Sequence, residues 1–112
     1  MIEKNQQWAF YKDAEPQDVG NGVTRRILAY CDGVMTVENE FVTGGVGPMH
    51  SHPHTQITYV LSGTFEFTIG DETKIVTTGD TLLKQDGIQH GCKCLEAGKL
   101  LDVFTPMRDD FI

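Results

Sequence analysis

The chain is poor in cationic residues, and this scarcity argues against a nucleic-acid partner. Its 112 residues carry 9 Lys and Arg against 16 Asp and Glu, a formal net charge of −7. Phosphate backbones bind a basic face, and the few Lys and Arg residues do not cluster into one. The same acidity repels an anionic ligand on average. A local cation, either a bound metal or a well-placed Arg, would therefore have to attract such a ligand.

The sequence also lacks the segments and the cysteine pattern of a membrane or exported protein. No run approaches the roughly 18 consecutive apolar residues of a membrane span, so we expect no membrane partner. Residues 1–7 lack the basic-then-apolar order of a secretory signal. The three cysteines are an odd number, and Cys92 and Cys94 lie too close together on a strand to staple a fold. This pattern favours reduced thiols in a cytoplasmic protein.

No window shows a helical period, and the hydrophobic pattern predicts an all-β chain instead. From Val23 onward, short segments rich in Val, Ile, Thr and Phe alternate with Gly, Asp or Pro turns, among them the hairpin-type pairs Asp32-Gly33 and Gly70-Asp71. Many short strands at this spacing indicate a single-domain sandwich or barrel. We expect strands over residues 23–31, 34–42, 47–52, 56–62, 64–70, 73–77, 80–84, 90–96 and 99–105.

Residues 1–20 are polar and irregular, and we expect them to form an N-terminal arm that packs on the body or on a neighbouring subunit. Near the other end, Leu100, Leu101, Val103 and Phe104 make one strand apolar on both faces. A strand buried on both sides in so small a protein suggests that another chain covers its outer face, so we predict a homodimer. The alternative is that the N-terminal arm covers that face.

Four side chains are predicted to hold a divalent metal ion: His50, His52, Gln56 and His90. Residues two apart in a strand point to the same side, about 6.6–6.8 Å apart along the chain, so His50 and His52 can aim at one point. Pro53 cannot donate to a ladder, so the strand should stop there and Gln56 should open the returning strand. His90 follows a glycine turn and points inward from another strand. Three imidazoles and one amide oxygen suit one divalent transition metal, Zn, Ni, Fe or Mn.

The spacing of these residues resembles the two motifs of the cupin superfamily. Residues 44–63 match the first motif, and residues 79–90 match the second. Two positions depart from the usual pattern, because Gln56 stands where most cupins carry Glu and Gln85 stands where they usually carry Pro. The resemblance implies a cupin jelly-roll barrel, a double-sheet β-sandwich, formed by residues 21–112.

The neutral amide of Gln56 has a chemical consequence. With three neutral imidazoles and an amide, the ligands leave the +2 charge of the cation uncompensated, which favours Lewis-acid binding of an anionic or enolate oxygen. It weakens the case for dioxygenase chemistry of the kind many Glu-bearing cupins perform. His54, at the tip of the turn, is expected at the rim of the site or in solvent. Cys92 and Cys94 are expected to be small buried hydrophobes.

The C-terminal segment supplies three candidate catalytic residues: Asp102, Phe104 and Arg108. Asp102 and Phe104 share the inward face of the last strand, where a carboxylate is costly unless it is paired or functional. Arg108 could reach back over the mouth of the barrel. An acid, an aromatic wall and a guanidinium near a metal form a site for proton transfer on a sugar acid. The alternative is a salt bridge between Asp102 and Arg108 that tethers the tail. One of Arg25 and Arg26 must also face inward, and the pattern does not distinguish them.

Residues 23–29, 50–63 and 102–111 closely resemble the small cupins known as pectin degradation proteins. The resemblance implies a metal-dependent isomerase or tautomerase that acts on a small anionic sugar acid. It would convert 4,5-unsaturated monouronates, released from pectin or alginate, into linear 4-deoxy-5-keto uronates. It also implies that the acid, the ring and the guanidinium of the C-terminal segment take part. The alternatives are another metal-dependent cupin enzyme, such as an oxygenase or a sugar isomerase, and a non-catalytic cupin that binds sugar acids.

Overall fold

The chain folds into two β-layers that share two long, bent strands. The computed structural model describes all 112 residues. It contains strands and two short 3-10 turns, and none of its helices is long and apolar enough to cross a membrane. The elements in chain order are η1 (Tyr11–Asp13), β1 (Gln17–Asp18), β2 (Val23–Cys31), β3 (Val34–Phe41), β4 (Val46–His50), β5 (Thr55–Ile69), β6 (Glu72–Thr77), β7 (Thr81–Lys84), β8 (His90–Thr105) and η2 (Asp109–Phe111).

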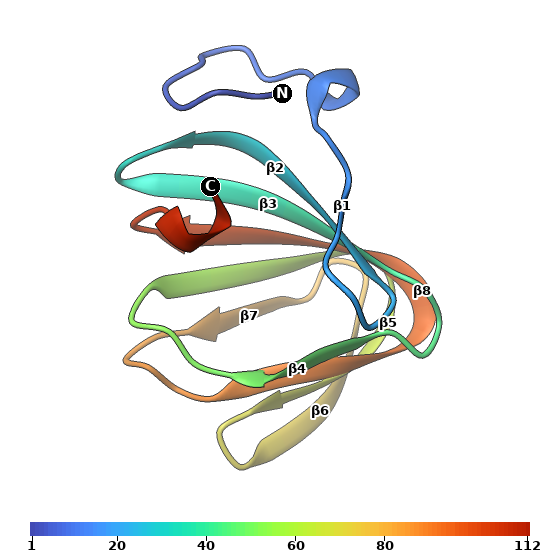
Figure 1. Cartoon of the computed structure of the whole chain (residues 1–112). Helices are drawn as coiled ribbons and strands as arrows, with labels where there is room; N and C mark the ends of the chain where they lie inside the picture. The colour runs from blue at the N-terminus through green and yellow to red at the C-terminus, as the bar shows by residue number, and fades with distance from the viewer.

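All strand pairs are antiparallel, and β5 and β8 lie side by side along most of their length. The first half of β5 and the second half of β8 form one layer with β1, β2, β3 and β7. The remaining halves form the other layer with β4 and β6. Figure 1 shows the two layers joined on the side where β8 curves from one to the other. The predicted all-β double-sheet sandwich in a single domain is confirmed.

The two long strands bend where Gly63 meets Gly98. A side chain at Gly98 would overlap the carbonyl oxygen of Ser62, and a Cβ on Gly63 would lie 2.6 Å from the carbonyl oxygen of Glu96. Gly63 also has a φ of +85°, in the left-handed region that favours glycine. The ladder between β5 and β8 shifts register at this point. Glycine therefore lets both strands pass from one layer to the other without ending.

This bend explains where the strand predictions succeed and fail. The strand over residues 23–31 has the predicted bounds, and the two predicted hairpin turns connect β2 with β3 and β5 with β6. The prediction of separate strands over 56–62 and 64–70, and over 90–96 and 99–105, is wrong. Each pair is one continuous strand, because a glycine that reads as a turn in the sequence is here a bend within a ladder.

Residues 1–20 pack against the outer side of β2 and β3 of the same chain. The Tyr11 hydroxyl donates a hydrogen bond of 2.6 Å to the Glu38 carboxylate. The main-chain N–H of Asn5 donates to the carbonyl of Tyr30 at 2.9 Å. Figure 1 shows this segment lying outside the layer that contains β2 and β3.

The outer side of β5, β7 and β8 carries an apolar patch. Ile57 pairs across the ladders with Leu83 of β7 and Val103 of β8, and Tyr59 pairs with Leu101. Ile57, Tyr59 and Leu83 are 46%, 42% and 51% exposed. We call these five residues the outer apolar patch. The alternative that the N-terminal segment covers this side is therefore wrong.

The space between the layers is filled by two apolar clusters. The larger cluster includes Phe65, which is fully buried and stacks edge-on against Phe41 with ring centroids 5.2 Å apart. Burying a Phe side chain contributes about 2–3 kcal/mol to folding. The smaller cluster joins Met35 and Val37 of β3 to Phe104 of β8.

Replacing Gly98 with Ala should destabilise the fold, because the new Cβ would overlap the carbonyl oxygen of Ser62. We expect the free energy of unfolding to fall by about 2–3 kcal/mol, measured by chemical denaturation. Gly33→Ala is the matched control, since a Cβ there meets open space, and it should change stability by less than about 0.5 kcal/mol. Equal stability of Gly98→Ala and the wild type would contradict the need for this close approach.

Candidate metal centre

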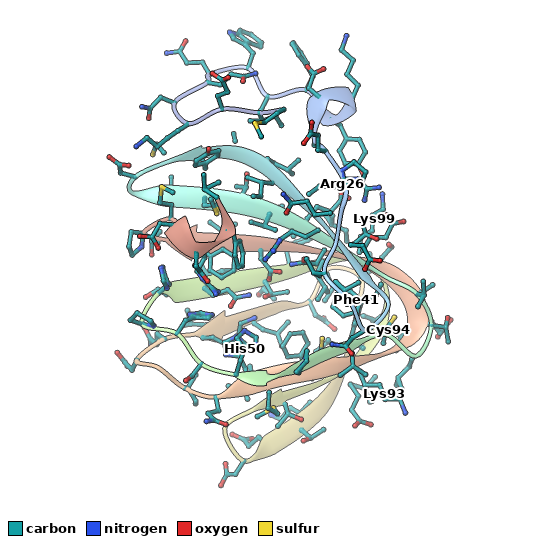
Figure 2. All side chains as sticks on the ribbon, in the orientation of Figure 1. Arg26, Phe41, His50, Lys93, Cys94 and Lys99 are labelled. Atoms are coloured by element: carbon teal, nitrogen blue, oxygen red, sulfur yellow. The ribbon has the colours of Figure 1, made fainter.

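The three histidines predicted as ligands come together between the layers. His50 ends β4, His52 lies in the following loop, and His90 begins β8. The rings of His50 and His90 have centroids 4.4 Å apart, and the His52 ring lies 5.0 Å from His90 and 5.6 Å from His50. The ligand atoms of all three lie within 4.8 Å of one another. Figure 2 shows His50 in the space between the two layers. These three side chains could hold a metal ion.

Main-chain carbonyls determine which nitrogen of each ring is free. Each Nδ1 lies at hydrogen-bond distance from a carbonyl oxygen: that of Pro48 for His50 (2.8 Å), that of His54 for His52 (3.1 Å) and that of Ile88 for His90 (3.0 Å). A carbonyl only accepts, so Nδ1 carries the hydrogen and the Nε2 lone pair is free. The Nε2 of His90 is buried and has no hydrogen-bond partner. Such a lone pair is costly unless it binds a cation.

Gln56 brings an amide oxygen to the same place. Its Nε2 donates to Asp102 Oδ1 at 2.8 Å, which orients its Oε1 toward His52 Nε2 at 2.9 Å. Both of these atoms are acceptors, so they repel each other when nothing lies between them. Two ligands bonded at about 2.1 Å to one cation can lie about 3 Å apart. The donor set therefore fits a divalent transition metal, and three nitrogens with one oxygen suit Zn, Ni, Fe and Mn alike.

Burial keeps two of the three imidazoles, those of His52 and His90, neutral, as metal binding requires. Removal from water lowers the pKa of His90 from 6.5 to about 4. Burial likewise lowers the pKa of His52. Both rings are therefore unprotonated at neutral pH, with lone pairs available to a cation.

Asp102 lies next to the histidines at the centre of a hydrogen-bond network. It is buried on the inward face of β8, as its alternation predicts. Its Oδ1 accepts from the amide of Gln56 and from the hydroxyl of Thr58, and its Oδ2 accepts from Asn39 at 2.6 Å. The ammonium group of Lys84, 1% exposed, donates to the Thr58 hydroxyl. Burial lowers the pKa of Lys84, and the nearby charge of Asp102 opposes that effect.

Three members of this network were missed by the sequence analysis. Thr58 could have been found, because it lies two residues after Gln56 and so shares its face of the strand. Asn39 and Lys84 lie on other strands. Nothing in their local sequence links them to Asp102, since only the pairing of β3 and β7 with the long strands brings them there.

Arg108 and Phe104 line a cavity next to the histidines, and the acidic partner of Arg108 is not the expected one. The guanidinium of Arg108 makes two bonds, of 3.0 and 2.8 Å, to the carboxylate of Asp110. The alternative of a salt bridge between Arg108 and Asp102 is therefore wrong. Arg108 lies over two rings, 5.2 Å from the Phe104 centroid and 4.3 Å from that of Phe111. These rings form an aromatic wall beside the histidines.

Of the two neighbouring arginines, Arg25 faces inward. Its guanidinium lies 3.9 Å from the Phe111 centroid and lines the cavity. Arg26 faces outward and bonds to Glu40 at 2.7 Å and to Glu38 at 3.4 Å. Figure 2 shows Arg26 on the side of the N-terminal segment.

None of the remaining candidates, His54, Cys92 and Cys94, belongs to the group of three converging histidines. His54 is half-buried, with its ring centroid 5.5 Å from that of His52. Cys94 is buried in the larger apolar cluster, as expected of a small hydrophobe. Cys92 lines the cavity, and burial raises the pKa of its thiol to about 12. Cys92 is thus a neutral thiol at physiological pH.

A cavity of about 250 Å³ joins these groups. Its volume suits a small ligand, and its wall combines neutral metal-type ligands, one carboxylate, aromatic rings and guanidinium groups. The arrangement can therefore bind a small anion next to a cation and exchange a proton with a carboxylate. The chemically relevant lining residues are Arg25, His50, Gln56, His90, Asp102, Phe104, Arg108 and Phe111.

Comparisons with known proteins agree with this architecture. The family model described as "Cupin domain" matches residues 37–104. The pectin degradation protein KdgF of Dickeya dadantii (strain 3937) is 39% identical over 106 residues, which are 92% of this chain and 96% of the relative. The solved structure of KdgF from Halomonas sp. has a TM-score of 0.91 at 33% identity and covers 96% of this chain and 100% of its own.

A second solved structure extends the likeness to nearly every residue. The RmlC-like cupin from Shewanella frigidimarina NCIMB 400 has a TM-score of 0.94 at 32% identity, over 99% of this chain and 100% of that one. The sequence relative and the two structures thus agree over nearly the whole chain, and the family model agrees with them over residues 37–104. The chain belongs to the cupin family and, within it, to the pectin degradation proteins of the KdgF type.

Proposed function

We propose that the chain is a metal-dependent isomerase that converts 4,5-unsaturated monouronates into linear 4-deoxy-5-keto uronates. The observation that carries the proposal is that three histidines able to hold a metal converge beside one cavity, and that two of them, His50 and His90, line it together with the inward carboxylate of Asp102. The relative named as the pectin degradation protein KdgF supports a sugar acid from pectin as the substrate, and we extend the proposal to the related acids from alginate. We place the reaction in the cytoplasm, where the three free cysteines would stay reduced.

The reaction moves one proton within the substrate. The hemiacetal hydroxyl at C1 loses its proton, the bond between C1 and the ring oxygen breaks, and an aldehyde forms at C1. The ring oxygen is left on C5 as an enolate, and a proton added at C4 converts it into a ketone. The change is an isomerisation, so it needs one group that takes and returns a proton and one that stabilises negative oxygen.

His50, His52, His90 and Gln56 are the proposed ligands of a divalent transition metal. When bound, the metal would supply a Lewis acid for an anionic oxygen. Four neutral ligands leave the +2 charge uncompensated, whereas a carboxylate at position 56 would reduce it to +1. The neutral ligand set therefore favours stabilisation of an enolate-type oxygen.

Asp102 is the proposed proton carrier. In its ionised form it accepts the C1 hydroxyl proton, and it then delivers that proton to C4. Hydrogen bonds from Asn39, Gln56 and Thr58 hold the carboxylate in one orientation. The buried ammonium of Lys84 lies behind Thr58, which offsets the cost of a charge in a buried position. A carboxylate held in this way needs little reorganisation when the substrate arrives.

Phe104 and Arg108 are proposed to act on the other side of the substrate. The Phe104 ring, 5.6 Å from the His52 ring, offers a flat wall for the sugar. The Arg108 guanidinium, stacked over that wall, is placed to stabilise the charge that develops on the enolate. Phe104 thus orients the substrate and Arg108 lowers the energy of the charged intermediate.

We also propose that the chain forms a homodimer through the outer apolar patch. Five apolar residues on neighbouring strands form one continuous surface there, and monomeric proteins rarely leave such a surface uncovered. Two copies could bury it by packing sheet against sheet, as in a β-sandwich core. The patch is on the outer side of the sheet, so pairing would leave the cavity open to substrate.

Removing the metal should abolish turnover of a purified 4,5-unsaturated monouronate. The assay follows the loss of ultraviolet absorbance of the conjugated double bond, with a protein-free sample as the background. We expect the rate to fall to that background after chelation and to return on addition of a divalent transition metal. Full activity in protein shown by elemental analysis to be metal-free would contradict the proposed function.

Asp102→Asn should reduce kcat in the same assay by about 10²–10⁴-fold, because the amide cannot carry the proton. The matched control is Asp71→Asn, which changes an exposed acid in the hairpin between β5 and β6 and should keep wild-type activity. The metal content of both variants is measured, because Asp102 also orients Gln56. An unchanged rate in Asp102→Asn would remove Asp102 as the proton carrier.

Leu83→Glu should convert the dimer into a monomer, because it places a charge within the outer apolar patch. Size-exclusion chromatography with light scattering measures the mass. Ile75→Glu is the control, since Ile75 is 58% exposed on β6 away from the patch, and it should remain dimeric. A wild-type protein that is monomeric at the same concentration would contradict the dimer, and a dimeric Leu83→Glu would exclude this face as the interface.

A further inference from the structure

Arg25 places a positive charge in the cavity from the inward face of β2. It pairs across the ladder with Asn39, which donates to Asp102. It lines the same cavity as His50 and His90. A guanidinium therefore lies on the same cavity wall as the proposed proton carrier, on a strand that contributes none of the proposed metal ligands.

Arg25 is the one arginine that has no acidic partner. Its only side-chain hydrogen bond is a long one, 3.4 Å from Nε to the amide oxygen of Gln17. No carboxylate oxygen lies within 4.0 Å of it. The other two arginines are both neutralised: Arg26 by Glu38 and Glu40, and Arg108 by Asp110 at 2.8 Å.

The surroundings make this missing partner costly. Arg25 is half-buried, and burial together with the nearby charge of Arg108 lowers its pKa, an effect that the charge of Asp110, which bonds to Arg108, only partly opposes. Both guanidiniums stack on the same ring, 3.9 and 4.3 Å from the Phe111 centroid. A partly buried cation next to a like charge is unfavourable unless an anion compensates it. Since the chain supplies no carboxylate that bonds to Arg25, an anionic ligand can supply one.

We propose that Arg25 binds the carboxylate of the acidic substrate. The planar guanidinium presents paired N–H donors that match the two oxygens of a carboxylate, which a hydroxyl or a neutral sugar cannot replace. Arg108 already bonds both oxygens of Asp110 through its Nε and Nη2, which leaves only Nη1 without a partner, so it is the weaker candidate for a contact with two oxygens. The identity of the acid as a uronate rests on the proposed function. The carboxylate site itself rests on the geometry of Arg25.

This assignment divides the work of the two arginines. Arg25 anchors the acid group against Phe111, and Arg108 is left to face the oxygen whose charge changes during the reaction. Binding energy at the unreactive carboxylate then orients the sugar relative to Asp102. An acidic chain of net charge −7 thereby gains selectivity for acids over neutral sugars from one residue.

The test compares Arg25→Gln with Arg26→Gln, which removes the neighbouring outward arginine. Isothermal calorimetry measures the binding of galacturonate and of neutral galactose to metal-loaded and to chelated protein. We expect Arg25→Gln to weaken galacturonate binding about 10- to 100-fold in both states and to leave galactose binding unchanged. Arg26→Gln should bind both sugars like the wild type. Arg25→Lys keeps the positive charge but not the paired N–H donors of the guanidinium, and it should recover part of the lost galacturonate affinity.

Kinetics with the unsaturated monouronate provide a second readout. We expect Arg25→Gln to raise KM about 10- to 100-fold and to change kcat much less, because the carboxylate does not react. Thermal unfolding of each variant shows that it is folded. If Arg25 serves only to hold the Phe111 ring in place, Arg25→Gln would be less stable than the wild type but would bind galacturonate equally well. This result would overturn the inference. A wild type that does not bind galacturonate would overturn it as well.

The outcomes also separate this inference from the proposed function. If the wild type binds galacturonate through Arg25 but does not convert the unsaturated uronate, the proposed isomerase activity is contradicted and the assignment of Arg25 to the carboxylate is supported. A wild type that turns over the uronate, with KM and galacturonate affinity unaltered in Arg25→Gln, would keep the isomerase and remove Arg25 from substrate binding.

Discussion

The amide of Gln56 connects the metal-type ligands to the acid, and the site depends on its orientation. Its nitrogen donates to Asp102, so its oxygen must face His52. A Glu at this position, as in most cupins that the motif resembles, would set a second carboxylate 2.8 Å from that of Asp102. Two buried like charges at that distance are strongly unfavourable. The buried carboxylate of Asp102 thus requires a neutral side chain, such as the amide of Gln56, at position 56.

The bend in the two long strands gives this arrangement its shape. His90 and Asp102 lie on the same strand, and in a straight strand they would be about 40 Å apart. The bend near Gly98 turns β8 back over itself, so one end carries His90 in one layer and the other end carries Asp102 in the other layer. Residues of one strand therefore line opposite walls of a single cavity. A sandwich without that bend would have no such enclosed site.

The distribution of charge explains how an acidic chain can take up an acidic ligand. Acidic residues outnumber basic ones, yet the cavity presents Arg25 and Arg108, and neutral imidazoles able to hold a cation. Asp110 neutralises Arg108 at the rim, whereas Arg25 keeps its charge unpaired inside. The cavity therefore offers local positive charge to the proposed uronate, although the chain as a whole carries net negative charge.

Local alternation in the sequence was enough to predict the inward pair Asp102 and Phe104 and the all-β sandwich. The strand expected over residues 47–52 is wrong at its end, because β4 ends at His50 and His52 meets the other two histidines from the following loop. A period of two depends only on the backbone of each strand, so neighbours and their shared face follow from spacing. The same alternation says that Arg25 and Arg26 face opposite ways, and it does not say which faces in. Tertiary structure decided that point, merged the predicted strands at Gly63, and brought Asn39 and Lys84 to the acid. These outcomes depend on which strands pair and in what register, and contacts between residues far apart in the chain set that pairing.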